Sequence, residues 1–415
     1  MFRTRNLHKL IIFILCANLA ILILYTQKIY QFERYFAKKE ISIQIQTKVN
    51  GNCLSVTSRL LPWYFCNGTL LPHISNRRVN LLFNGSLGDR IIEQLMYIPK
   101  DYRDKNIILK KVLAYSGLKG WAKNAGRKAF ESCPVAGCSL SDDPQDAPNA
   151  DAILFQNPED TRFLTQGLDQ VWILYLLESP YHTPKLHLYD NIFNWTATYR
   201  EDSDLVTPYA KWVYYDARVT QKPQGVNYAL NKTKKVAWLV SNCKAKNERK
   251  EYALELQNHI SVDIYGNCGQ WSCDQEDMDC FELLKDYKFY LSFENSNCRD
   301  YITEKLFRNA FEYNVVPIVM GARKQDYVRS APSNSFIHVN DFNNPEDLAQ
   351  YLKRLDQDDD LYNTYFNWKG TGEFINTYFW CRLCALLHSP YSKKWYTNLG
   401  EWWAGTGICD IPIRK

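Results

Sequence analysis

The segment that most constrains the fold is residues 289–321, FYLSFENSNCRDYITEKLFRNAFEYNVVPIVMG. Its aromatic and apolar start, 289–293, predicts a buried strand, and the β-branched run at 315–320 predicts a second one. A loop dense in polar residues lies between them, and a helix is expected to begin at 303–306. Open α/β sheets bind ligands beyond the carboxyl ends of their strands, so the loop after residue 293 is a predicted ligand site.

The same alternation of strands and helices extends along most of the chain. Strands are expected at 79–83, 106–115, 150–155 and 171–177, and again at 236–240, 262–266, 289–293, 315–320 and 336–339. Helices are expected between them, for example at 248–259 and 345–355. Such alternation predicts parallel sheets. A polar linker near 220–235 divides the pattern, so we expect two Rossmann-like α/β domains, at 76–225 and 226–365, and a C-terminal segment at 366–415.

The N-terminus predicts a membrane anchor. Residues 10–25 are apolar except for Asn18, and Arg3, Arg5 and Lys9 precede them. This run is a little shorter than the ~20 residues that span an average bilayer. A cleaved signal peptide is the alternative, but no small-residue cleavage site follows the run. We therefore expect a cytoplasmic tail at 1–9, a signal-anchor transmembrane helix at 10–26 and a stem at 27–75.

Cysteines and glycosylation sequons predict the side of the membrane. Only Cys16 of the 13 cysteines lies in the apolar run, and the remaining even number fits disulfides in an oxidising compartment, with Cys53 and Cys66 as a local pair. Four sequons suggest exposure to the same compartment: Asn67, Asn84, Asn194 and Asn231. The sequence thus predicts a type II membrane protein whose C-terminal bulk is luminal.

Charge excludes one large class of partners. The chain has 50 basic and 45 acidic residues, and no basic stripe is interleaved with aromatic residues, so nucleic acid is not an expected partner. Two Asp-x-Asp pairs, 202–204 and 277–279, have the spacing with which some nucleotide-sugar enzymes hold a divalent cation. The pattern is short and frequent, and we expect no catalytic metal.

Several separated blocks resemble one known family. The block FENSNCRDYITEK (293–305) resembles the donor-binding signature of the α1,3-fucosyltransferases of glycosyltransferase family 10. Four further blocks resemble the family in the same order: WILYLLESP (172–180), SNCKAKNER (241–249), VDIYGNCG (262–269) and WKGTGEFINTYFWCRLC (368–384). The resemblance implies the two-domain GT-B fold, GDP-fucose as donor, a Golgi location and no required metal, although some members are stimulated by Mn²⁺. It also implies that Cys133 and Cys138 pair with Cys381 and Cys384.

The donor site can be argued partly from chemistry. A pyrophosphate needs fixed cations, and Arg249 and Lys305 each stand near the start of a helix that follows a strand, where exposed N–H groups also favour phosphate. The resemblance implies further contacts to the nucleotide sugar from Tyr199, Ser241, Asn242, Tyr290, Asn295 and Tyr301, with Glu304 holding sugar hydroxyls. For Tyr290, packing in the core is the alternative.

The predicted catalytic base is Glu178. Transfer from β-linked GDP-fucose to an α-linked product inverts the anomeric carbon, so a single positioned base is enough. Glu178 follows the apolar run 171–177, where partial desolvation is expected to raise its pKa, and it matches the base proposed for the family. Asp202 and Asp204 are the runners-up, expected to orient Arg200 or to shape the site.

The acceptor is predicted from the particular residues that these blocks contain. SNCxAxNxR, WKGTGEF and FWCRLC are most similar to the branch of invertebrates and plants that fucosylates the core of N-glycans. Members acting on outer N-acetyllactosamine resemble one another in a glutamine before the first-domain cysteine pair, and residues 102–143 here contain none. Two alternatives stay open: a Lewis-type fucosyltransferase, and a catalytically inactive glycan-binding relative.

Overall fold

A computed structural model describes residues 89–99, 102, 107–119, 121, 125–272, 278–391 and 393–409. The elements below belong to one compact unit, residues 47–117 together with 125–415. The predicted anchor, stem, strand at 79–83, Cys53/Cys66 pair and sequons at Asn67 and Asn84 lie outside the described residues. Within the described ranges, no helix is both long and apolar enough to span a bilayer.

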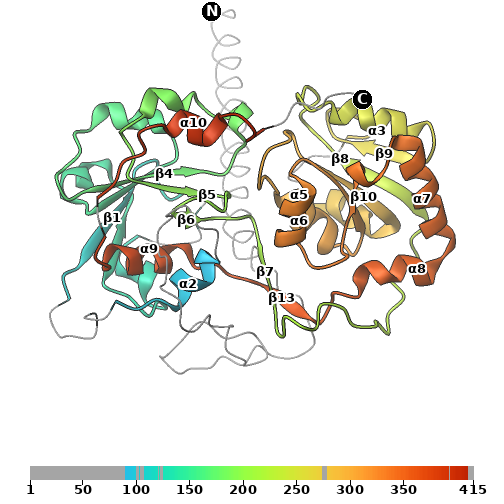
Figure 1. The fold of residues 1–415 in the computed structure, drawn as a ribbon, viewed down its shortest axis with the longest axis horizontal. Coiled ribbons are helices and arrows are strands. Elements are labelled where there is room, and N and C mark those ends of the chain that lie inside the picture. Colours follow the sequence, from blue (N-terminus) through green and yellow to red (C-terminus); the bar gives the residue numbers. More distant parts are fainter. Residues whose placement is uncertain are drawn as a thin grey trace, which may run out of the picture. The chain divides into compact units, whose positions relative to one another are not determined.

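The first sheet has six parallel strands in the order β2-β1-β3-β4-β5-β6 (Figure 1). Its strands are β1 (Lys110–Ala114), β2 (Cys138–Ser141), β3 (Ala152–Phe155), β4 (Val171–Leu176), β5 (Trp195–Thr198) and β6 (Leu205–Val206). Strand β3 is buried at every residue, and so is β4 except at Tyr175, which is why both read as continuous apolar runs.

The second sheet has five parallel strands in the order β12-β11-β10-β8-β9. Its strands are β8 (Lys234–Leu239), β9 (Val262–Tyr265), β10 (Tyr287–Phe293), β11 (Val316–Met320) and β12 (Ile337–His338). Helices α3 (Arg249–Gln257), α4 (Met278–Glu282), α5 (Glu304–Leu306), α6 (Lys324–Ser330), α7 (Pro345–Gln357) and α8 (Asp359–Asn363) accompany it. The predicted α/β architecture with parallel sheets is therefore confirmed, as are the predicted helices that become α3 and α7.

Five strands were missed because they are short or polar. Strands β2, β5 and β6 carry serine or threonine or span two residues, so they show no apolar run. The other two, β7 (Lys211–Tyr214) and β13 (Gly372–Ile375), pair with each other in an antiparallel ribbon. Such strands form because the neighbouring sheet or ribbon supplies their hydrogen bonds and burial, which the local sequence does not encode.

The C-terminal residues return to the first sheet. We call the part of the protein built around the first sheet the first half, and the part built around the second sheet the second half. Helix α9 (Phe379–Leu387) is joined to the first half by Cys133–Cys381 and Cys138–Cys384, which confirms the predicted cysteine partners. The buried guanidinium of Arg382 donates to Gln94 Oε1 in helix α2 (Arg90–Met96) and to the carbonyl of Val206. Helix α10 (Leu399–Ala404) lies beside the same sheet (Figure 1).

Burial overturns one predicted glycosylation site. Asn194 is 1% exposed, and its amide donates to the carbonyl of Lys394 while Oδ1 accepts from Gln166 Nε2 and the backbone N–H of Trp172. A side chain used in this way cannot carry a glycan in the folded protein. Asn231 is exposed, with φ of 66°, and remains a predicted site.

We therefore predict that glycopeptide mass spectrometry of the full-length protein from eukaryotic cells will find a glycan on Asn231 and none on Asn194. The physical reason is that Asn194 is buried, and its Nδ2, the atom that would carry the glycan, already donates to the carbonyl of Lys394. An occupied Asn194 in active, folded protein would contradict the described packing.

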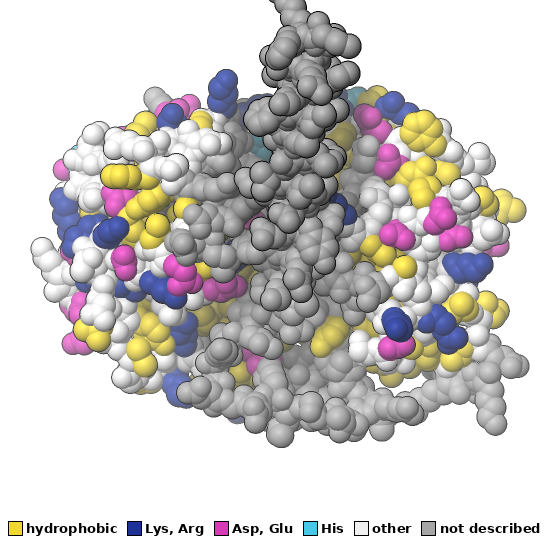
Figure 2. Space-filling view, turned by 180° about the vertical axis from the view of Figure 1, so that it is seen from behind, with side chains coloured by type: hydrophobic (Ala, Val, Ile, Leu, Met, Phe, Trp, Pro, Cys, Tyr) yellow, Lys and Arg dark blue, Asp and Glu magenta, His cyan; other side chains and the backbone are white. Residues whose placement is uncertain are grey.

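Acidic and basic side chains of the described residues are mixed on the face seen in Figure 2. Figure 2 shows lysine, arginine, aspartate and glutamate interspersed over the visible face, with no band of one sign. This distribution agrees with the balanced charge of the sequence.

Candidate active site

Glu178 stands just beyond the carboxyl end of β4 and is exposed to solvent. Its Oε1 accepts three hydrogen bonds: from Tyr301 Oη at 2.6 Å, from the backbone N–H of Ser179 at 2.7 Å and from Asn295 Nδ2 at 3.2 Å. Tyr301 and Asn295 belong to the loop after β10, in the second sheet. The structure thus brings the predicted base together with two of the predicted donor-binding residues, and Oε2 takes part in none of these three bonds.

The direction of the Glu178 pKa differs from the prediction. Burial raises the pKa of this carboxyl, as expected, but the hydrogen bonds from Tyr301, Ser179 N–H and Asn295, together with the electrostatic effect of the nearby His182, outweigh burial and lower it. The predicted raised pKa is therefore wrong for the protein without substrate, because donors from the second half of the chain stabilise the carboxylate.

The loop of residues 294–303 begins with a buried carboxylate. Glu294 is 0% exposed; Oε1 accepts from the N–H of Thr303 at 2.8 Å, and Oε2 accepts from its hydroxyl at 2.9 Å. Lys305 Nζ pairs with the same Oε2 at 3.1 Å. Gly321 at the end of β11 makes this burial possible, because a Cβ there would lie 2.6 Å from the Cβ of Glu294.

Lys305 is the centre of a charged cluster. Its ammonium also contacts Glu304 Oε1 at 3.1 Å and the hydroxyl of Thr303 at 2.9 Å. Burial lowers the pKa of Lys305, but Glu294 and Glu304 outweigh burial and raise it, so the side chain is a permanent cation. Burial raises the pKa of Glu304, but the adjacent ammonium outweighs that effect and lowers it. Because its side chain is 19% exposed, Lys305 can still meet a ligand.

Arg249 lies at the start of α3 and is largely buried. It donates to the carbonyl of Phe293 at 2.7 Å and to that of Asn242 at 3.1 Å, and its Nε has no hydrogen-bond partner among the described residues. Burial lowers the pKa of Arg249. These bonds join α3 to the end of β10, so Arg249 both organises the strand ends and retains an unsatisfied donor.

The remaining predicted residues divide into three groups. Ser241 and Asn242 are exposed in the turn after β8, where a ligand can reach them. Tyr199 comes from the first half and packs its ring 5.1 Å from that of Tyr301, and its buried hydroxyl has no partner among the described residues. Tyr290 is fully buried and its hydroxyl accepts from Asn309, so its predicted contact with the donor is wrong and core packing is its role.

The two Asp-x-Asp pairs do not form a described metal site. Asp202 pairs with Arg200 at 2.5 Å, as predicted, and with Arg299 at 3.4 Å. Asp204 is buried and pairs with Lys394. The second pair, 277–279, lies where the side chains are not described. Asp202 and Asp204 are therefore committed to ion pairs that organise the strand ends.

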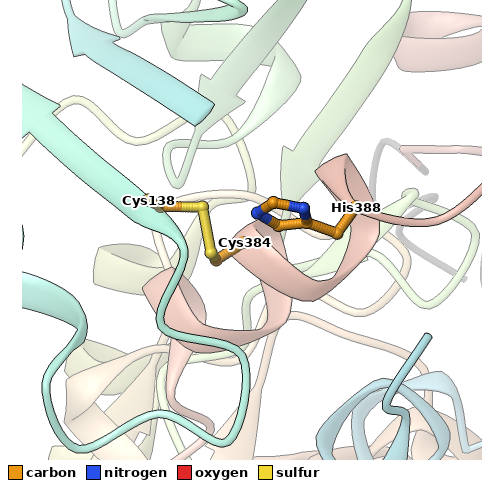
Figure 3. A group of neighbouring side chains, drawn as sticks. All are labelled: Cys138, Cys384 and His388. Atoms are coloured by element: carbon orange, nitrogen blue, oxygen red, sulfur yellow. A yellow bond between two sulfur atoms is a disulfide. The ribbon is translucent and has the colours of Figure 1, made fainter. Parts of the chain in front are cut away.

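One cluster of described residues consists of side chains that can bind a metal ion, but its two cysteines form a disulfide with each other. The ligand atoms of Cys138, Cys384 and His388 lie within 4.8 Å of one another. The two sulfur atoms are bonded to each other, with the imidazole beside them (Figure 3). His388 Nε2 lies 3.0 Å from the carbonyl of Gly137, which it satisfies as a donor. The cluster is structural.

Sequence reasoning missed Glu294, Ser179 and Ser296. The two serine hydroxyls lie 2.8 Å apart and form another contact between the halves. The sequence did carry a signal for Glu294, because this residue directly follows the apolar run that forms β10, which is buried at all seven residues. The serines had none, since only the packing of the two halves brings them together.

This geometry is that of a group-transfer enzyme: at the strand ends of two parallel sheets, an accessible carboxylate is held by the loop that leads into Lys305. Models of "Fucosyltransferase, N-terminal" and "Glycosyltransferase family 10 (fucosyltransferase) C-term" match residues 109–210 and 229–402. The chain belongs to glycosyltransferase family 10, the fucosyltransferases, and the resemblance found in the sequence is confirmed.

Two relatives found by sequence agree with this assignment. The chain is 50% identical to the glycoprotein 3-alpha-L-fucosyltransferase A of Drosophila melanogaster over 84% of its own length and 73% of that protein. It is 38% identical to alpha-(1,3)-fucosyltransferase C of the same species, over 68% of this chain and 72% of that one. A solved α1,3-fucosyltransferase with GDP-fucose aligns at a TM-score of 0.45 and 17% identity, covering 73% of this chain and 97% of that one.

Proposed function

We propose that this fucosyltransferase transfers L-fucose from GDP-fucose to O3 of a GlcNAc in the chitobiose core of an N-glycan, with inversion at the anomeric carbon. The observation that carries the proposal is Glu178: an exposed carboxylate held by Tyr301 and Asn295, on the loop that leads into Lys305. A positioned base facing the donor loop suits one direct displacement. The two-domain arrangement is the one called GT-B.

In this reaction the acceptor O3 attacks the anomeric carbon of fucose while its proton passes to Glu178, and the bond from that carbon to GDP breaks. The departing diphosphate gains negative charge. Lys305 is a permanent cation beside it, and Arg249 carries a spare Nε–H donor. Fixed donors of this kind stabilise developing charge without reorganisation. Ser241 and Asn242 would contact the nucleotide and Glu304 the hydroxyls of fucose. No metal is required, although stimulation by Mn²⁺ is compatible with a pyrophosphate leaving group.

Two observations favour the N-glycan core over outer N-acetyllactosamine. The relative with 50% identity is named for action on glycoproteins. Residues 102–143 also lack the glutamine that members acting on N-acetyllactosamine share. A Lewis-type acceptor is the second candidate. An inactive glycan-binding relative is disfavoured, because Glu178, Arg249, Glu304 and Lys305 are all present.

The disulfides and the N-terminal apolar run support the proposed location. Four disulfides join described residues: Cys133–Cys381, Cys138–Cys384, Cys243–Cys268 and Cys298–Cys409. Such a framework is typical of oxidising compartments. With the predicted anchor at 10–26, it supports a single-pass type II protein of the Golgi membrane with a luminal catalytic part.

The decisive experiment offers the full-length protein two acceptors at equal concentration with GDP-fucose. We expect transfer to a trimmed-mannose N-glycopeptide, with the new linkage at O3 of a core GlcNAc, and little transfer to free N-acetyllactosamine. Mass spectrometry and linkage analysis of the products provide the measurement. Efficient transfer to N-acetyllactosamine with none to the glycopeptide would establish the Lewis-type alternative.

A further inference from the structure

The base receives two of its hydrogen bonds from a loop that is anchored elsewhere. Tyr301 and Asn295 both lie in the 294–303 loop, and between them stands Cys298, which is 1% exposed. Cys298 forms a disulfide with Cys409 across 111 residues of sequence. The loop is therefore covalently anchored at a residue that lies, along the sequence, between the two residues that hold Glu178.

The partner of Cys298 belongs to a short terminal segment, residues 399–409, which we call the C-terminal strap. Next to the disulfide, the N–H of Arg299 donates to the carbonyl of Ile408 at 2.8 Å, and Cys298 and Cys409 form an isolated antiparallel bridge. Arg323 also donates to the carbonyl of Gly407. The end of the strap is thus fixed to residues near the second sheet by backbone, side-chain and covalent contacts.

The start of the strap is fixed to the first half. The backbone N–H groups of Leu399 and Gly400 donate to Asp190 Oδ1 at 2.6 and 3.3 Å, and Trp403 Nε1 donates to Thr183 Oγ1 at 2.8 Å. Trp403 is 1% exposed. Thr183 and Asp190 belong to the segment that follows Glu178 directly, so the strap connects the base-bearing segment with the base-holding loop.

Charged groups reinforce this connection. The guanidinium of Arg200 lies 4.3 Å from the ring centroid of Trp402 in the strap and pairs with Asp202. Asp202 also pairs with Arg299 of the loop. The strap is therefore in contact with residues of both sheets' surroundings: Arg200 from the first and, through Asp202, Arg299 from the second.

We propose that the C-terminal strap positions the 294–303 loop against Glu178, with Cys298 and Cys409 as positioning residues for the base. The inference rests on the proposed role of Glu178. Two hydrogen bonds to one carboxylate oxygen hold only if their donors keep their places, and a displacement of about 1 Å can cost ~100-fold in rate. The disulfide limits that displacement because it lies three residues from each donor.

The test is Cys298→Ser/Cys409→Ser in the full-length protein. We expect kcat for fucose transfer to fall about 10- to 100-fold while the Kd for GDP changes by less than about threefold. GDP affinity should persist because neither cation is held by the disulfide itself. Arg249 donates to the carbonyls of Phe293 and Asn242, and Lys305 contacts Glu294 and Thr303 at the two ends of the loop. An unchanged kcat would overturn the proposal.

A pH profile separates positioning from general stabilisation. The groups facing Glu178 are His182 on its own segment, Tyr199 and Tyr209 from the first half and Tyr301 from the loop. Weaker hydrogen bonds from the loop leave burial less opposed, so the pKa of Glu178 should rise. The acid limb of the kcat/KM profile, which reports the free enzyme, should therefore move to higher pH in the variant. A profile that falls in height with no shift of its acid limb would overturn the positioning role.

The matched control is Cys133→Ser/Cys381→Ser, which removes a disulfide with no residue in the loop or the strap while the neighbouring Cys138–Cys384 bond remains. We expect its kcat within a few-fold of wild type and its acid limb unmoved. A loss of kcat with a shifted acid limb equal to that of the strap variant would show a general disulfide effect and overturn the proposal.

The other anchor supplies an independent check. Trp403→Phe keeps an aromatic ring at this buried position, although a smaller one, and removes the hydrogen bond to Thr183. If the strap acts as a unit, the losses of kcat from Trp403→Phe and from the strap variant should combine less than additively. Additive losses would contradict the model.

The loop can also be followed without any acceptor. Hydrogen exchange of peptides covering 294–303 should speed up in Cys298→Ser/Cys409→Ser, whatever the reaction is. If the wild type transfers no fucose, the proposed function fails while this measurement still tests the strap. If the wild type is active and the loop exchanges as before, only the strap is refuted.

Discussion

Glu178→Gln is expected to lose fucose transfer by ~10²–10⁴-fold while GDP binds nearly as before, because loss of a general base typically costs that much. The substitution isolates the chemistry. A glutamine can present its amide oxygen where Oε1 now accepts from Tyr301, Ser179 N–H and Asn295, so the three hydrogen bonds survive. What is removed is the negative charge of the carboxylate and its ability to take up a proton.

The pH dependence of kcat/KM in the wild type also tests whether Glu178 is the base. Because the pKa of Glu178 lies below its ordinary value, the carboxylate remains ionised until the pH falls through that lowered pKa. The acid limb of kcat/KM, which reports the free enzyme, should therefore lie below the usual range of a glutamic acid.

Initial rates over a range of pH, together with calorimetry of GDP binding, provide the measurement. Glu255→Gln, an exposed position on α3, is the control for loss of one carboxylate and should retain full activity. Activity of Glu178→Gln within a few-fold of wild type would remove Glu178 from the reaction.

Lys305→Ala is expected to destabilise the protein by about 3–5 kcal/mol and to weaken GDP binding severely. Removing one partner of a buried ion pair leaves the other charge uncompensated, and that situation typically costs this much. Glu294 is 0% exposed, and Lys305 lies 3.1 Å from its Oε2. Burial already raises the pKa of Glu294, so loss of the ammonium removes the main favourable charge beside it.

The two effects can be separated by a second substitution. In Lys305→Ala/Glu294→Gln the buried negative charge is gone, and a glutamine can accept from the N–H of Thr303 while donating to its hydroxyl. We expect the double variant to recover most of the lost stability and none of the GDP affinity. Denaturant unfolding and calorimetry on the same samples provide both numbers.

Full recovery of GDP binding in the double variant would contradict a role for Lys305 at the pyrophosphate. Lys285→Ala, whose partner Glu282 is an exposed neighbour on the surface, is the matched control. Exposed pairs contribute about 0–1 kcal/mol, so its stability and GDP affinity should hardly change.

The sequence by itself determined the α/β class, most long strands and the family, because these depend on local alternation and on contiguous blocks. The buried runs at 171–177 and 289–293 became β4 and β10, and the block at 293–305 proved to be a loop opening into a helix capped by Thr303. Sequence also placed Glu178 at a strand end and paired Cys133 and Cys138 with the C-terminal cysteines through the family resemblance.

Only the tertiary structure decided what these residues touch. Glu178 and Tyr301 are 123 positions apart, so the hydrogen bond that reverses the pKa shift expected from burial had no local signal. The same holds for Asn194. Its sequon predicts an exposed site, but the side chain is buried and hydrogen-bonded to the backbone of Trp172 and Lys394. The Cys298–Cys409 bond likewise joins segments 111 residues apart. Burial, charge pairing and hydrogen-bond donors arrive from distant segments, and a pattern of neighbours along the chain does not record them.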